Sequence, residues 1–403
     1  MNSPTAAFPY IPGIRLLHSP GPSNVPKAVM DAMTNQPIDM GDPRVDACID
    51  ACEDGLRSLL NAPSAEVFMY AANGHGVWEA MIVNLLAPGQ KVLILGTGHF
   101  SDSWALMAEA MGAVVLRTPY QEGYPIDLAA VQDALRADTK HEIVAVFAVH
   151  TDTASSTTSD VLALRKAIDA TKHPALFVVD VVASLGAVPF EMEKWGVNAV
   201  IGASQKGLMV PPGVGFCAAD ARAMEVCAAN PAPRFYWDWL RRRKGPSYSR
   251  FCGTAPQNLL FGMQASFGLL AKEGLANVHA RHARLAGAVQ AAVASWSEAG
   301  NLQFLCRVPE ARSVSVTAVL VKPGIDPELI RKTARDKFQV LIAGGLGPFA
   351  GRVFRIGHLG DLNPAMILGC LSGVEAAMQS LGINVGERGV RSAVEYLART
   401  ADQ

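Results

Sequence analysis

The sequence of 403 residues predicts an α/β protein with a mostly parallel sheet, followed by a smaller α+β unit. From about residue 65, short apolar runs alternate with amphipathic segments, which is typical of parallel strands joined by helices. Half of the residues are hydrophobic and 18% are charged, which suits a large buried interior. Beyond residue 300 the order changes to strand, helix, strand and helix, which predicts the second unit.

Residues 1–25 are rich in Pro, Gly and Ser and predict an extended arm, and a helical stretch starts near Val25. Apolar runs then predict the strands of a parallel sheet with helices on both faces: Lys91–Leu95, Val114–Arg117, Ile143–Val149, Ala175–Val179 and Ala199–Ile201. The run Gly213–Cys217 follows so soon that an antiparallel strand is expected. Helices are predicted at Ser103–Met111 and at Leu128–Ala137, where Asp127 is a candidate N-cap.

A long helical span, Leu275–Ala299, ends at Gly300 and predicts a domain boundary. We therefore expect the arm over 1–25, a large domain over 26–299 and a small C-terminal domain over 300–403. The elements of the small domain are expected at Val314–Val321, Pro327–Lys337, Val353–Ile356 and Pro364–Leu381.

The 35 Lys and Arg residues nearly balance the 36 Asp and Glu residues, so the net charge is −1. This balance gives no electrostatic reason to expect nucleic acid or an anionic membrane as a partner. Seven scattered cysteines without a CxxC pair favour reduced thiols, and no His or Cys spacing predicts a metal site. No stretch reaches the roughly 18 apolar residues of a spanning helix, and the N-terminus lacks a signal-peptide pattern. We expect a soluble, cytoplasmic protein.

Three segments contain residues that are suited to binding or catalysis. The small-residue turn of Ala72–Ala80 leads into an apolar helix, whose N-terminal N–H groups are suited to a phosphate, although many such turns merely start helices. Asp180 ends a fully apolar strand, where ligands bind in open α/β sheets; the alternative is a helix N-cap. Lys206 is enclosed by small and apolar residues, and a buried lysine with a depressed pKa is suited to a covalent bond with a carbonyl group. Together these are the parts needed to hold pyridoxal 5′-phosphate.

Four stretches carry a family resemblance: SPGPSN at 19–24, DVVASLG at 180–186, GASQKGLMVPPG at 202–213 and FRIGHLG at 354–360. The chain resembles the class V aminotransferases, specifically the alanine-, serine- and aspartate-glyoxylate group. The resemblance implies a PLP-dependent transferase of fold type I, with a mostly parallel seven-stranded sheet in the large domain. It also implies a homodimer whose active sites are shared between subunits.

The resemblance assigns roles to the residues that match the family's motifs. Lys206 would bind the cofactor covalently and then move the proton during catalysis, and Asp180 would pair with the pyridine nitrogen. Arg355 would bind the α-carboxylate of the substrate, a bidentate contact that lysine cannot copy. The other cofactor contacts implied are Phe100 and Val182 on the two faces of the ring, Thr153 and Gln205 at the phenolic oxygen or the phosphate, Asn73, Gly74 and His75 at the phosphate, and Thr254 from the neighbouring subunit.

The function implied is transfer of the amino group of a small L-amino acid, such as serine, alanine or aspartate, to glyoxylate or a similar 2-oxo acid. Two alternatives stay open: a pyridoxamine-pyruvate-type transaminase, which the segment His150–Thr153 resembles, and a PLP-dependent lyase on the same fold. The chain departs from the family's usual residues at Asp39–Pro43, Asn73–Gly76 and Phe251, so the amino donor is left open.

Overall fold

The computed structural model describes residues 13–386 and 388–402. Its larger sheet has seven strands in the order β2-β10-β9-β8-β5-β3-β4. In chain order they are β2 (Glu66–Ala72), β3 (Lys91–Ile94), β4 (Val114–Arg117), β5 (Ile143–Val149), β8 (Leu176–Asp180), β9 (Ala199–Ala203) and β10 (Gly213–Ala219). The strand β10 runs opposite to the other six strands, so the carboxyl ends of those six meet at one edge of the sheet.

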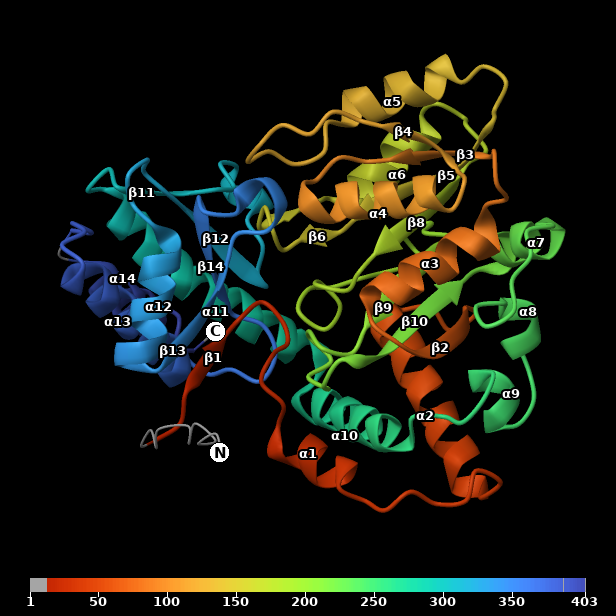
Figure 1. The fold of residues 1–403 in the computed structure, drawn as a ribbon, viewed down its shortest axis with the longest axis horizontal. Helices are drawn as coiled ribbons and strands as arrows, with labels where there is room; N and C mark the ends of the chain where they lie inside the picture. Colours follow the sequence, from red (N-terminus) through yellow and green to blue (C-terminus); the bar gives the residue numbers. More distant parts are fainter. Residues whose placement is uncertain (1–12, 387, 403) are drawn as a thin grey trace, which may run out of the picture.

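Helices cover both faces of this sheet (Figure 1). One face is covered by α3 (Gly74–Leu85), α4 (His99–Ala110) and α7 (Ala221–Ala229), with a core that includes stacked aromatic rings. The opposite face is covered by α2 (Pro43–Leu60), α5 (Leu128–Ala137), α6 (Val161–Asp169) and α10 (Gln257–Glu273). The strands are nearly continuous apolar runs because both of their faces are buried.

A second sheet of five strands has the order β1-β13-β14-β12-β11. Its strands are β1 (Leu16–His18), β11 (Leu302–Phe304), β12 (Val316–Val321), β13 (Val340–Gly344) and β14 (Val353–Gly357). Four helices pack with it around one apolar core, α11 (Leu275–Ser297), α12 (Pro327–Phe338), α13 (Pro364–Ser380) and α14 (Gly389–Arg399). The arm contributes β1, which pairs in parallel with β13, and Figure 1 shows it in red beside the blue C-terminal elements.

Short elements complete the fold: α1 (Lys27–Met33), the β6–β7 hairpin (Thr151–Asp152 and Thr157–Thr158), α8 (Trp239–Arg242) and α9 (Ser247–Phe251). The structure confirms the predicted strands 114–117 and 143–149, the antiparallel β10, and helix α5, whose N-cap Asp127 accepts a hydrogen bond from Ala129 N. The strand β2 was not among the predicted runs. The predicted domain boundaries stay a prediction. Among the described helices, none has both the length and the apolar character that crossing a membrane requires.

Candidate active site

A cavity of about 220 Å³ opens at the edge of the large sheet where the parallel strands end. Ligands of open α/β sheets bind at this edge, because loops and helix N-termini gather there. Its lining residues are Asn73, Gly74, His75, Trp78, Phe100, Val149, Thr151, Thr153, Asp180, Val182, Ala183, Gln205 and Lys206. All of the cofactor contacts expected from sequence, except Thr254, therefore lie around one cavity.

Asp180 is the last residue of β8 and is 4% exposed. Its Oδ1 accepts a hydrogen bond from Val182 N at 2.7 Å, and its Oδ2 accepts one from the indole Nε1 of Trp78 at 2.8 Å. Burial raises the pKa of this carboxyl to about 7, against the opposing effect of these two hydrogen bonds. A carboxylate poised near neutrality is suited to share a proton with a basic ring nitrogen.

Lys206 follows β9, in the loop that turns back toward β10. Burial lowers the pKa of its amine to about 8, and the positive charge of Arg355 acts in the same direction. The amine donates a hydrogen bond of 2.6 Å to the carbonyl oxygen of Pro20 in the arm. Ser23 holds the same loop, because its hydroxyl donates to Lys206 O at 2.8 Å. The arm thus packs directly on the segment that carries the lysine.

The N-terminus of α3 faces the cavity beside β8. Asn73 caps the helix, with its side-chain oxygen accepting from Gly76 N at 3.2 Å. Within the described residues, the N–H groups of Gly74 and His75 have no acceptor, which is what an anion site at a helix N-terminus requires.

Asp152 positions the start of α4. This fully buried carboxylate accepts hydrogen bonds from Phe100 N and Ala154 N, both at 2.9 Å, and from the Thr97 hydroxyl at 3.2 Å. Burial raises its pKa, and the hydrogen bonds oppose the rise. These contacts fix Phe100 and the neighbouring Thr153 at the cavity wall. Sequence reasoning had not singled out Asp152.

Pyridoxal phosphate fits this set of residues. Gln205 lines the cavity, and in the described part of the chain its buried side-chain oxygen has no hydrogen-bond partner. Buried polar atoms are rarely left unpaired, so this oxygen indicates a polar ligand. The N-terminus of α3 would hold the phosphate, the amine of Lys206 would bind the aldehyde, and the carboxylate of Asp180 would pair with the ring nitrogen.

Arg355 lies on β14, the strand that enters the site from the smaller sheet, and is 5% exposed. Its guanidinium donates to Thr153 O at 2.8 Å and to Gly344 O at 2.6 Å. Both acceptors are neutral carbonyl groups, and the guanidinium forms no ion pair with a carboxylate of the described residues. Burial lowers its pKa to about 10. A buried cation paired only with neutral groups, next to the cavity wall, is suited to bind an anionic substrate group.

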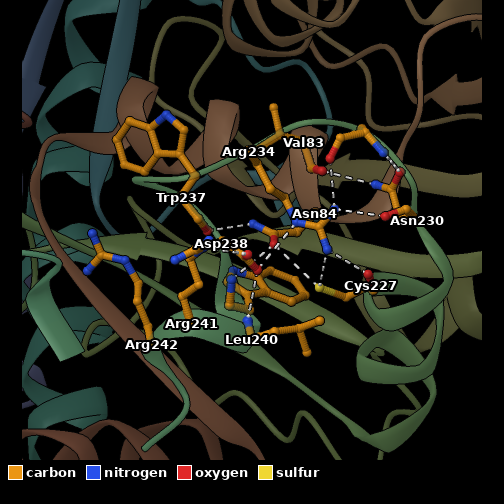
Figure 2. A network of polar contacts seen from close by, with 12 residues as sticks. Val83, Asn84, Cys227, Asn230, Arg234, Trp237, Asp238, Leu240, Arg241 and Arg242 are labelled. Atoms are coloured by element: carbon orange, nitrogen blue, oxygen red, sulfur yellow. Dashed lines mark hydrogen bonds and ion pairs between the residues drawn. The ribbon is translucent and has the colours of Figure 1, made fainter. Parts of the chain in front are cut away.

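A polar network holds the segment after α7 against α3 (Figure 2). The buried Asn84 of α3 donates to Trp237 O at 2.8 Å and accepts from Trp239 N at 3.1 Å. Arg234 donates to Cys227 O at 2.7 Å, which ties the segment to the end of α7. The network fixes Trp237 against Gly76, where an added Cβ would lie 3.2 Å from the indole ring.

Thr254 is the one expected cofactor contact that lies outside this cavity. It lines a separate, more open hollow of about 550 Å³ with Ile38, Met40 and Leu259. Sequence reasoning missed Trp78, which donates to Asp180 from the second turn of α3. The available signal was helical spacing, because Trp78 lies three residues after His75 and so shares its face of the helix.

Residues 15–347 match the family model described as Aminotransferase class-V. The chain is 38% identical over 392 residues to serine--glyoxylate aminotransferase of Methylorubrum extorquens, covering 96% of both chains. It is 39% identical over 385 residues to L-aspartate--glyoxylate aminotransferase of Paracoccus denitrificans, covering 94% of this chain and 96% of that one. The crystal structure of pyridoxamine-pyruvate aminotransferase from Mesorhizobium loti aligns over 100% of both chains, with a TM-score of 0.86 and 25% identity.

Proposed function

The chain belongs to the class V aminotransferase family and is a PLP-dependent transaminase, and we propose that it moves the amino group of a small L-amino acid to glyoxylate or a similar 2-oxo acid. Serine, alanine and aspartate are the donors proposed. The observation that carries the proposal is that Lys206 and Asp180 line one cavity, and that Arg355 lies beside it and donates to the backbone of Thr153, another lining residue. Relatives named for serine and for aspartate, each with glyoxylate, support the substrate class.

Each of the three residues has one proposed role. When bound, pyridoxal phosphate supplies an aldehyde for the amino group and a ring that accepts the electron pair left at Cα. Arg355 binds the α-carboxylate and so orients the substrate Cα–H bond toward Lys206. The Lys206 amine takes the proton from Cα and then gives it to the cofactor. The lowered pKa of the amine favours this proton transfer. Asp180, held by its two donors, keeps the proton on the ring nitrogen.

We also propose a cytoplasmic homodimer with shared active sites. Thr254 does not line the cavity of its own subunit, and this supports a role at the cavity of a partner subunit. Exposed apolar side chains near this hollow, Met40 and Tyr248, are 48% and 56% exposed and are suited to an interface. All seven cysteines are free thiols, which supports a reducing compartment.

A half-reaction screen tests the function. Single L-amino acids are added to the protein loaded with pyridoxal phosphate, and the visible absorbance of the bound cofactor is followed. Serine, alanine or aspartate should remove it, and glyoxylate added afterwards should restore it. If no amino acid reacts while free pyridoxamine and pyruvate do, the alternative transaminase is correct. Release of ammonia without restoration by any 2-oxo acid would instead identify a lyase.

A further inference from the structure

Trp78 lines the cavity, and neither the expected roles nor the proposed mechanism assign it a function. Its indole is 2% exposed and lies on the first half of α3. Three rings surround it: His75 at 4.5 Å, Trp104 at 5.7 Å in a stacked arrangement, and Phe100 at 6.2 Å edge-on, measured between centroids. Trp104 in turn stacks on Phe147 of β5 at 4.4 Å. The orientation of the Trp78 indole is therefore fixed by packing on α4, whose Trp104 packs in turn on the sheet.

This fixed orientation aims the indole N–H at Asp180. The Nε1–Oδ2 distance is 2.8 Å, which is a short hydrogen bond to a carboxylate. The other carboxylate oxygen is held by Val182 N at 2.7 Å, so each oxygen has one neutral donor and Asp180 forms no ion pair within the described residues. Each oxygen keeps a further acceptor site, and the carboxylate itself lines the cavity.

An indole N–H can donate a hydrogen bond but has no acceptor site. Trp78 therefore stabilises Asp180 only when Asp180 acts as an acceptor. It cannot accept a hydrogen bond from Asp180 when Asp180 is protonated on Oδ2. Without it, the buried carboxylate would keep one donor and would favour the neutral acid more strongly. A neutral acid would have to donate to the ring nitrogen, which would leave that nitrogen unprotonated.

We propose that Trp78 is a positioning residue that holds Asp180 as an ionised acceptor facing the ring nitrogen of the cofactor. The inference rests on the proposed function, because it takes pyridoxal phosphate as the ligand of the cavity. It goes beyond that function because it names a residue outside the expected cofactor contacts, Trp78, as the one that controls the ionisation of Asp180.

The test compares two ligands that differ at one ring atom. Pyridoxal phosphate and its 1-deaza analogue, which has a C–H in place of the ring nitrogen, are titrated into the full-length protein freed of cofactor. Trp78→Phe keeps an aromatic ring and removes the N–H. Since hydrogen bonds to charged groups are the stronger ones, we expect affinity for pyridoxal phosphate to fall about tenfold to 100-fold. Affinity for the deaza analogue should change by less than about threefold.

Trp104→Phe is the matched control. Trp104 belongs to the same aromatic cluster and is fully buried, and its indole nitrogen finds no acceptor in the part of the chain that the structure describes. Its loss should change both affinities by the same factor. In an Asp180→Asn background, Trp78→Phe should no longer discriminate between the two ligands. If Trp78→Phe does not fold, Trp78→Leu gives the same comparison, because leucine also has no donor and a general loosening of the site weakens both ligands alike.

The outcomes separate this inference from the proposed function. A selective loss of pyridoxal phosphate in Trp78→Phe supports the inference. Equal loss of both ligands, or no loss, overturns it and leaves the proposed function standing, provided that the wild-type protein binds pyridoxal phosphate. If the wild-type protein binds neither ligand, the proposed function itself fails.

Discussion

Burial is the first cause of the perturbed pKa at each of Lys206, Asp180 and Arg355. It lowers the pKa of the two bases and raises that of the acid, as expected when charge is removed from water. The surroundings of each residue therefore favour the uncharged form of its side chain more than water does, before any substrate arrives. Two of these pKa values, about 8 and about 7, lie where proton transfer is efficient near neutral pH.

The lowered pKa of Lys206 predicts a pH dependence for cofactor capture. Only the neutral amine has the electron pair that attacks an aldehyde, and burial lowers the pKa from 10.5 to about 8. In the protein freed of cofactor, the neutral form increases as pH rises and is nearly complete above about pH 9. The rate of pyridoxal phosphate capture, followed by absorbance after rapid mixing, should rise up to about pH 9 and then level off. A rate that still climbs about tenfold between about pH 8 and pH 9 would contradict the lowered pKa.

The guanidinium of Arg355 predicts a requirement for an α-carboxylate. Arg355→Lys keeps the charge but loses the two-pronged contact, which should cost about 2–4 kcal/mol in kcat/KM, or roughly 30- to 1,000-fold. Every amino donor and 2-oxo acid should be affected. If free pyridoxamine were the true donor, its half-reaction would be nearly unchanged while the pyruvate half-reaction suffered. Insensitivity of both half-reactions would show that Arg355 does not bind the carboxylate.

At the scale of elements, the arm and the loop after β9 form one unit around the lysine. Ser23 N donates to Gln205 O, and Pro20 O accepts from the Lys206 amine. Gly21 lies between these contacts with a φ of +140°, and a Cβ there would lie 2.5 Å from Lys206 Cδ. The backbone conformation thus favours glycine, and a side chain at this position would have to displace the end of the lysine side chain.

Gly21→Ala should therefore disturb Lys206. We expect the variant to capture pyridoxal phosphate several-fold more slowly, because the arm and the lysine side chain must move apart. Gly324→Ala is the control for backbone strain alone, since Gly324 also has a positive φ, +96°, but has open space around its Cβ position. Equal capture rates in both variants, measured by absorbance, would show that the arm does not constrain the lysine.

An element could be predicted where the residues that determine it lie within its own segment of the sequence. Helix α5 and the strands 114–117 and 143–149 were predicted with correct bounds, because caps and apolar runs lie within each segment. The pairing of Leu16–His18 with β13 joins residues more than 300 positions apart and leaves no local trace. Helix α11 was predicted from its long pattern, but the packing of its second half into the core of the smaller sheet was not.

In the candidate site, too, residues within local motifs could be predicted, whereas contacts between distant segments could not. Motifs located Lys206, Asp180 and the start of α3, since each stands in a recognisable stretch of sequence. The contacts between Trp78 and Asp180 and between Pro20 and Lys206 depend on tertiary packing, which no motif encodes.

At the scale of the whole molecule, the proposed dimer makes a prediction about size and activity. Two cavities completed across an interface require that the active species be a dimer, because Thr254 lines only its own separate hollow within one chain. Sedimentation at assay concentration should give a dimer. The variant Thr254→Ala should bind the cofactor more weakly but should remain a dimer. A fully active monomer would contradict the shared site.

The central claim is that this cavity binds pyridoxal phosphate through Lys206, and chemical mapping tests it most directly. The protein loaded with pyridoxal phosphate is reduced with borohydride, which makes the bond to the amine permanent, and its peptides are analysed by mass spectrometry. We predict one modified residue, Lys206, and no modification at this position or visible cofactor absorbance in Lys206→Ala. Modification of a different lysine as the main product, or an unmodified Lys206 in an active sample, would contradict the account.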